Sequence, residues 1–107
     1  MSNRVLFSED AERDLADLCH YIVGRDGMRA GDRMLREIEQ ACLRIGNLPE
    51  CGNIPKELIS VGITEYRELH HKPWRMIYRV IGNDVVIYCI TNGRRDMRSF
   101  LERRLLR

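Results

Sequence analysis

The sequence predicts a single α+β domain in the order β-α-α-β-β-β, in which a helical hairpin packs on a small antiparallel sheet and a short helix follows at the C-terminus. The spacing of apolar residues carries this prediction, because it is helical up to about residue 46 and has a period of two from residue 64 to residue 91. Glycine and proline separate the two regions. A chain of 107 residues has room for one such domain, covering residues 1–107.

The first half of the chain predicts one strand and two helices. Residues 3–7 read as a short strand, and the hydroxyl of Ser8 can cap the helix that follows. The apolar stripe of this helix comprises Ala11, Leu15, Leu18, Cys19 and Ile22. After a break near residues 24–27, the stripe of the second helix comprises Ala30, Met34, Ile38, Ala41, Cys42 and Ile45. The break is short, so we expect the two helices to form an antiparallel hairpin.

The second half predicts a loop, three strands and a terminal helix. Proline and glycine interrupt residues 49–62, which we interpret as a connecting loop. Residues 64–70, 74–81 and 84–91 read as strands, and the turn at Gly82 makes the last two an antiparallel hairpin. Residues 94–107 predict a short helix with an apolar edge and an exposed arginine-rich side.

Composition excludes several classes of protein. Hydrophobic residues at 44% and charged residues at 32% are typical of a globular protein. No run approaches the roughly 18 to 20 apolar residues of a membrane span, and the N-terminus carries no signal-peptide pattern, so we expect a cytoplasmic location. The four cysteines form no metal-binding cluster; we therefore expect reduced thiols, no metal and no cofactor.

The net charge of +2 conceals an asymmetry between the two halves. Residues 1–50 carry 7 basic and 10 acidic residues, a balance of −3, whereas residues 51–107 carry 11 and 6, a balance of +5. Sixteen of the eighteen basic residues are arginine, which suits bidentate contacts to phosphate or carboxylate, although the bias can equally reflect the base composition of the genome. The basic half is where we expect an anionic partner.

Alternation along residues 74–81 suggests where part of this charge lies. Trp74, Met76, Tyr78 and Val80 should face the helices, which turns Arg75 and Arg79 to the opposite side. If Arg67 joins them, three guanidinium groups converge on one open, concave sheet face. The alternative is that Glu65 and Glu68 neutralise these arginines as cross-strand pairs.

Five segments, in order and at the right spacing, resemble the RelE/ParE toxins of type II toxin–antitoxin systems. They are "FSEDAERDLADLCHYIV", the helix end "LPECG", "YRELHHKPWRMIYRV", "DVVIYCI" and "NGRRD". The resemblance covers nearly the whole chain, and the Gly-Arg-Arg-Asp sequence after the last strand is more like the ParE branch.

The ParE resemblance implies a toxin that poisons DNA gyrase, blocks replication, arrests growth and serves in plasmid stabilisation. Its target-binding residues would be Arg67, Arg75, Arg79, Arg94, Arg95 and Arg98. A ParD-like antitoxin would neutralise it in a hetero-oligomer by folding onto the helical hairpin and a sheet edge. The antitoxin-binding residues would be Leu15, Leu18, Ile22, Met34 and Ile38.

The RelE resemblance implies the alternative, a ribosome-dependent endonuclease that cleaves mRNA. Attack by the 2′-hydroxyl on phosphate requires a base, an acid and cations. The candidates for this chemistry are Arg67, His70, Arg79 and Tyr88, with His71 as a further candidate. Asn92 stands where such nucleases place an ionisable group and many ParE-like chains a histidine, and it cannot transfer a proton at neutral pH. We therefore favour a gyrase inhibitor over an enzyme.

Overall fold

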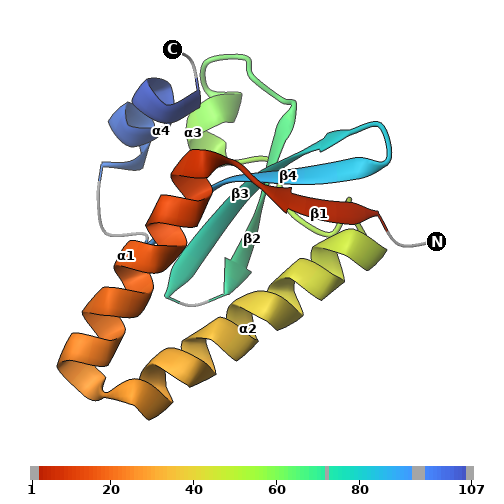
Figure 1. Ribbon diagram of the computed structural model, residues 1–107. Coiled ribbons are helices and arrows are strands. Elements are labelled where there is room, and N and C mark those ends of the chain that lie inside the picture. Colours follow the sequence, from red (N-terminus) through yellow and green to blue (C-terminus); the bar gives the residue numbers. More distant parts are fainter. Residues whose placement is uncertain (1–2, 72, 93–95, 106–107) are drawn as a thin grey trace.

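The computed structural model describes residues 3–71, 73–92 and 96–105, and its helices and strands follow the expected order (Figure 1). The elements are β1 (Arg4–Phe7), α1 (Glu9–Asp26), α2 (Met28–Asn47), α3 (Lys56–Ile59), β2 (Tyr66–His71), β3 (Trp74–Ile81), β4 (Asp84–Asn92) and α4 (Met97–Leu105). The α+β class, the helical hairpin and the C-terminal helix are confirmed. One element was not anticipated: the single-turn helix α3 lies in the segment expected to be a loop.

The four strands form one sheet in the order β1-β4-β3-β2. The pairs β2–β3 and β3–β4 are antiparallel, as expected, with a register shift between Ile77 and Tyr78. β1 differs from the expectation of a wholly antiparallel sheet, because it runs parallel to β4 with Arg4 opposite Asp84. The helical hairpin, α3, β2 and β3 all lie between β1 and β4 in the sequence, so paired residues of these two strands are 80 positions apart.

The helical hairpin has clear local causes. The Ser8 hydroxyl accepts a hydrogen bond from the Ala11 amide at 3.1 Å and caps α1. Gly27, at φ 94°, separates α1 from α2 in a conformation that side chains disfavour. A Cβ on Gly31 would lie 2.5 Å from a methyl carbon of Val23, so the glycine lets the helices approach closely near their turn. From this turn the two helices diverge toward the sheet (Figure 1).

The main core lies between the hairpin and one face of the sheet. The helices contribute Ile22, Met34, Ile38 and Ile45, and the strands contribute Leu69, Trp74, Met76, Tyr78 and Ile87. The period-two alternation of β3 therefore predicted the correct side for Trp74, Met76 and Tyr78, whereas Val80, which was also expected to pack against the helices, is 38% exposed.

A second core covers the opposite face, which we expected to be open. Ile77 of β3 and Cys89 of β4 are buried there against Leu58 of α3 and against Met97 and Leu101 of α4. The prediction of an open arginine face is wrong because the central strands carry apolar residues on both faces, as strands covered on both sides do.

Candidate functional site

Arg75 does not face solvent. Its side chain is buried and forms hydrogen bonds of 2.5 and 2.8 Å with the two carboxylate oxygens of Glu68, and of 2.9 and 3.0 Å with those of Glu57 on α3. These hydrogen bonds raise the pKa of Arg75, most of all those that Arg75 donates to Glu57. In turn, the hydrogen bonds from Arg75 lower the pKa of Glu57. Arg75 is therefore a structural cation that joins β3, β2 and α3. Of the two glutamates that the sequence offered as neutralising partners, Glu68 is the one that contacts Arg75.

Arg67 lies on the opposite face of the sheet from Arg75. It pairs with Tyr78 across β2 and β3, and its Nη1 donates a hydrogen bond to the carbonyl of Gly52 at 2.8 Å. The Tyr78 hydroxyl donates to the Pro49 carbonyl at 2.7 Å and accepts from the Gly52 amide at 3.0 Å. Arg67 and Tyr78 thus hold the segment between α2 and α3. The expected convergence of Arg67 with Arg75 and Arg79 is wrong, because alternation along β2 places Arg67 on the hairpin side.

The same contacts explain why residue 52 is a glycine and why the pKa of Tyr78 is raised. A Cβ on Gly52 would lie 2.5 Å from the Glu68 carbonyl oxygen and 2.7 Å from the Tyr78 hydroxyl, so no larger residue fits without moving backbone. Burial raises the pKa of Tyr78 to about 12, so this hydroxyl stays protonated as a hydrogen-bond donor at neutral pH. It is a fixed part of the fold.

Arg79 keeps the side expected for it and has aromatic neighbours. Its guanidinium carbon lies 6.0 Å from the centre of the Tyr66 ring, on the α3 and α4 side of the sheet. Tyr66 and Tyr88 meet edge to face at 5.5 Å, and burial raises the pKa of Tyr66. We call Tyr66, Tyr88 and the half-buried Arg79 the tyrosine–arginine cluster. Tyr66 was missed from the sequence, although its pairing with Arg79 follows from the β2–β3 register.

The two adjacent histidines are held apart by strand alternation. His70 is 63% exposed with its Nε2 3.3 Å from Glu68, whereas His71 lies 3.6 Å from Glu37 on α2, across the sheet. His70 is four residues along β2 from Tyr66, roughly 13 Å at the rise of a strand. The four residues proposed for a nuclease therefore occupy three places: Arg67 on the hairpin face, His70 at one end of β2, and Arg79 with Tyr88 at the other.

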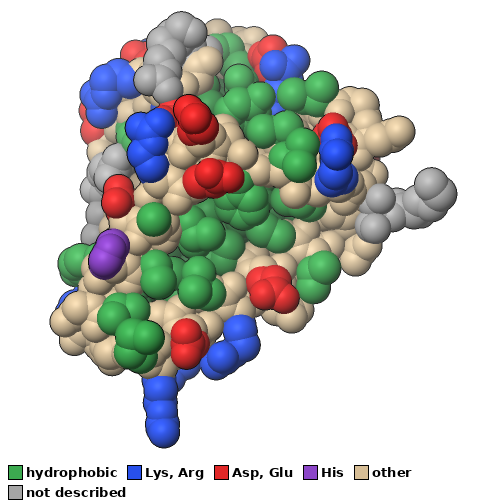
Figure 2. Space-filling model, in the orientation of Figure 1, with side chains coloured by type: hydrophobic (Ala, Val, Ile, Leu, Met, Phe, Trp, Pro, Cys, Tyr) green, Lys and Arg blue, Asp and Glu red, His purple; other side chains and the backbone are tan. Residues whose placement is uncertain are grey.

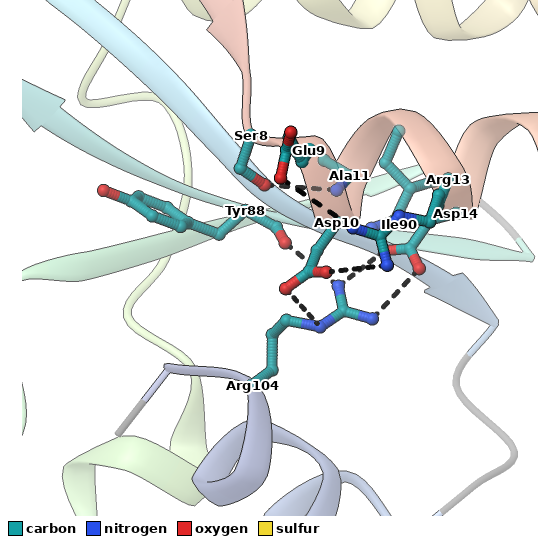
Figure 3. A network of polar contacts seen from close by, with 9 residues as sticks. All are labelled: Ser8, Glu9, Asp10, Ala11, Arg13, Asp14, Tyr88, Ile90 and Arg104. Carbon is teal, nitrogen blue, oxygen red and sulfur yellow. Dashed lines mark hydrogen bonds and ion pairs between the residues drawn. The ribbon is translucent and has the colours of Figure 1, made fainter. Parts of the chain in front are cut away.

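The C-terminal helix α4 is fastened to α1 by Arg104 (Figure 3). Its guanidinium forms hydrogen bonds of 2.8 and 3.1 Å with the two carboxylate oxygens of Asp14 and one of 3.1 Å with the Tyr88 carbonyl, and lies 3.6 Å from Asp10. The hydrogen bonds that Arg104 donates to Asp14 raise the pKa of Arg104. Asp14 also accepts the Ile90 amide at 3.0 Å, so helix, strand and C-terminal helix meet at one carboxylate. The sequence offered no signal for this pair, which is separated by 90 residues.

The other arginines expected at the target are less constrained or lie outside the described residues. Arg98 is 62% exposed, and its Nε is 3.5 Å from Glu102 one turn along α4. Arg94 and Arg95 fall outside the described residues.

Three of the five residues expected to bind the antitoxin are core residues. Ile22, Met34 and Ile38 are 8%, 3% and 2% exposed, and their side chains pack beneath the hairpin. Leu15 and Leu18 are partly exposed. Apolar side chains gather between and over the two helices, on the face that Figure 2 shows. A partner on this face would therefore contact Leu15 and its surface neighbours rather than the buried stripe.

The cysteines and the helices add no further chemistry within the described residues. All four cysteines are free thiols, and burial raises the pKa of Cys42 to about 11. Across residues 3–71, 73–92 and 96–105, no group of three or more histidine, cysteine, aspartate or glutamate side chains could hold a metal ion. None of the helices in these ranges combines the length and apolar character needed to cross a bilayer.

Two sequence comparisons agree with this architecture. The family model described as "ParE toxin of type II toxin-antitoxin system, parDE" matches residues 5–97. Toxin ParE3 of Caulobacter vibrioides is 31% identical over 94 residues, which make up 88% of this chain and 86% of the relative.

Solved structures with the same fold come from toxin–antitoxin systems. The chromosomal ParDE system of P. aeruginosa contains a chain that superposes with a TM-score of 0.71 at 16% identity, covering 85% of this chain and 96% of the other. The toxin–antitoxin complex RelBE2 of Mycobacterium tuberculosis gives 0.63 at 18% identity, with coverages of 86% and 92%. A mutant of E. coli toxin RelE in the free state gives 0.61 at 13% identity, with coverages of 94% and 93%. At these identities the likeness concerns the fold.

Proposed function

Since the chain belongs to the ParE toxin family of type II toxin–antitoxin systems, we propose that it poisons DNA gyrase, blocks replication and is neutralised by a ParD-like antitoxin. As a gyrase inhibitor it would act in the cytoplasm, bound to its antitoxin in a hetero-oligomer until the antitoxin is lost. Its action would need a complementary binding surface and no proton transfer.

The dispersal of acid, base and cation is the observation that carries this proposal. RNA cleavage by a 2′-hydroxyl needs a proton acceptor, a proton donor and a cation around one phosphate. His70 lies beside Glu68 and the already neutralised Arg75, and Arg67 donates to a backbone carbonyl on the other face. Among the described residues, no histidine lies with the tyrosine–arginine cluster. Tyrosine alone, with a pKa raised at Tyr66, is a poor base at neutral pH.

The surface that remains for the target lies on the α4 side of the sheet. Arg98 keeps an exposed guanidinium group there, and Arg79 is half-buried beside Tyr66. In the sequence, Arg94 and Arg95 stand between β4 and α4, outside the described residues. An arginine beside two tyrosine rings suits contact with an acidic or nucleic-acid partner. Within this proposal Arg67 and Arg75 support the fold and do not contact the target.

The test is which macromolecule stops being made first. Bacteria expressing the chain from an inducible promoter are pulsed with labelled thymidine and labelled methionine. We expect DNA synthesis to fall before protein synthesis, and Arg79→Met combined with Arg98→Met to relieve the arrest. Arg36→Met is the matched control, because this exposed arginine lies on α2, which packs on the opposite face of the sheet from α4.

Two results would contradict the proposal. If protein synthesis stops first and messages are cut at codon positions, the ribosome-dependent endonuclease is the correct reading. If uninduced and induced cultures grow alike, the chain is not an active toxin. Co-expression of a ParD-like antitoxin should restore growth in the culture that expresses the unmodified chain.

A further inference from the structure

We propose that the groove beside the helical hairpin receives a basic amphipathic segment of the antitoxin, and that Glu12 and Glu39 select its lysine or arginine residues. The inference rests on the proposed function in that the partner is taken to be the antitoxin. It adds the chemistry of the segment, which the family relationship does not supply.

The groove consists of two apolar hollows that follow one another along β1 and α2. The first, of about 400 Å³, is lined by Phe7, Leu15, Cys19 and Leu35, together with Glu12. Its lining is almost entirely apolar. Leu35 is 39% exposed, although it is a large aliphatic side chain on this apolar lining.

The second hollow, of about 270 Å³, lies further along the same path. Its apolar lining comes from Val5, Cys42 and Leu43, and Glu39 is its charged member. Leu35 and Cys42 are seven residues apart on α2, which places the two hollows about 10 Å from each other. A segment with two apolar side chains at that separation would fill both. In Figure 2 the apolar side chains of this face have both acidic and basic side chains around them.

Glu12 and Glu39 are the charged residues among the described residues that line the two hollows. Both are exposed, and within the described part of the chain neither has an ion-pair partner. By contrast, the neighbouring Glu9 and Asp10 lie near Arg13. A partner that filled the hollows would take water away from Glu12 and Glu39, and a carboxylate that loses water without gaining a cation is unfavourable. The groove therefore favours lysine or arginine beside the apolar anchors.

This local preference opposes the charge of the whole molecule. The chain carries a net charge of +2, so nonspecific attraction would favour an acidic peptide. A preference for a basic peptide would consequently come from the groove and not from the overall field. The sign of the preference separates the two explanations.

The experiment uses three labelled peptides of equal length titrated onto the purified full chain by fluorescence anisotropy. One carries leucines seven residues apart with lysines beside them, the second has glutamates in place of the lysines, and the third has the lysine sequence scrambled. We expect the lysine peptide to bind most tightly. Glu12→Gln with Glu39→Gln should weaken its binding about 5- to 30-fold, the effect of two ion pairs of modest strength, and remove most of its salt dependence.

Controls separate the groove from general electrostatics. Asp17→Asn removes an exposed carboxylate from α1 that lines neither hollow, and it should leave binding unchanged. Leu35→Ser should weaken the lysine peptide because it removes an apolar wall. Circular dichroism checks that each variant keeps its fold.

Three outcomes would overturn the proposal. They are tighter binding of the glutamate peptide, equal binding of the lysine peptide by the double glutamine variant, and a dimer of the chain that Leu35→Ser dissociates, which would assign the groove to a second copy. The growth-arrest assay keeps this result separate from the proposed function. The double glutamine variant should still arrest growth, whereas a wild-type chain that does not arrest growth removes the toxin proposal and leaves the peptide preference standing.

Discussion

Replacing Arg75 by methionine tests whether an arginine that the sequence placed at the target instead holds the fold together. Methionine keeps an unbranched side chain but removes four hydrogen bonds of 2.5 to 3.0 Å to Glu57 and Glu68. The two carboxylates, 14% and 12% exposed, then face each other without a cation. Breaking a buried ion pair from one side costs about 3 to 5 kcal/mol. Because some water reaches both carboxylates, we expect a loss of about 3 kcal/mol, the lower end of this range.

Urea denaturation followed by circular dichroism measures this loss directly. For a domain of this size we also expect the melting temperature to fall by roughly 10 to 15 °C. Arg98→Met is the matched control, because Arg98 is exposed on α4 and its loss should change stability by no more than about 0.5 kcal/mol.

A compensating variant distinguishes an unpaired charge from lost packing. Glu57→Gln and Glu68→Gln added to Arg75→Met remove the uncompensated carboxylates, so more than half of the lost stability should return. The reasoning would be refuted if Arg75→Met unfolded at the wild-type urea concentration. It would also fail if the three substitutions simply added their separate losses.

Three further predictions follow from the polar contacts of the fold. Hydrogen bonds from Arg75 lower the pKa of Glu57 from its ordinary value of 4.5, so the stabilisation by this carboxylate is complete above about pH 5 and is lost as the pH falls through the folded-state pKa. Glu57→Gln should therefore reduce the loss of urea stability between about pH 5 and 3. An unchanged loss of stability over this range would contradict the prediction. Arg104→Gln leaves Asp14 without its cation and should lower the free energy of unfolding by about 2 to 3 kcal/mol. Amide hydrogen exchange should then become faster in α4 than in the rest of the chain, and an equal change throughout would contradict the role of Arg104 in holding α4 to α1. Burial raises the pKa of Cys42 to about 11, so iodoacetamide at pH 8 should modify it far more slowly than an exposed thiol, and mass spectrometry of its peptide would reveal the opposite.

Local patterns predicted the features of the fold that depend on neighbouring residues. The Ser8 cap, the helical hairpin and the side of the sheet to which Trp74, Met76 and Tyr78 point all follow from spacing of a few residues. The parallel pairing of β1 with β4 joins residues about 80 positions apart, and no local pattern reports it. The single turn α3 was hidden by the proline and glycine residues that predict a loop.

The candidate site was harder to predict because charge in a sequence does not reveal its partner. Arg75, Arg79 and Arg67 look alike as letters, yet one is neutralised inside the protein, one lies beside two tyrosines and one binds a backbone carbonyl. The distinction depends on Glu57 and Gly52, which reach the sheet only through the tertiary fold. The sequence did carry one signal that both faces of β3 are covered: the apolar Ile77 stands between Arg75 and Arg79 on the face expected to be open.

The most direct test of the whole account is the state of plasmid DNA after incubation with purified gyrase, ATP and the chain, followed by detergent and protease. The account predicts linear plasmid from trapped cleavage complexes, less of it with Arg79→Met, and intact message on ribosomes given the same amount of protein. Undamaged, fully supercoiled plasmid together with cut ribosome-bound message would contradict it.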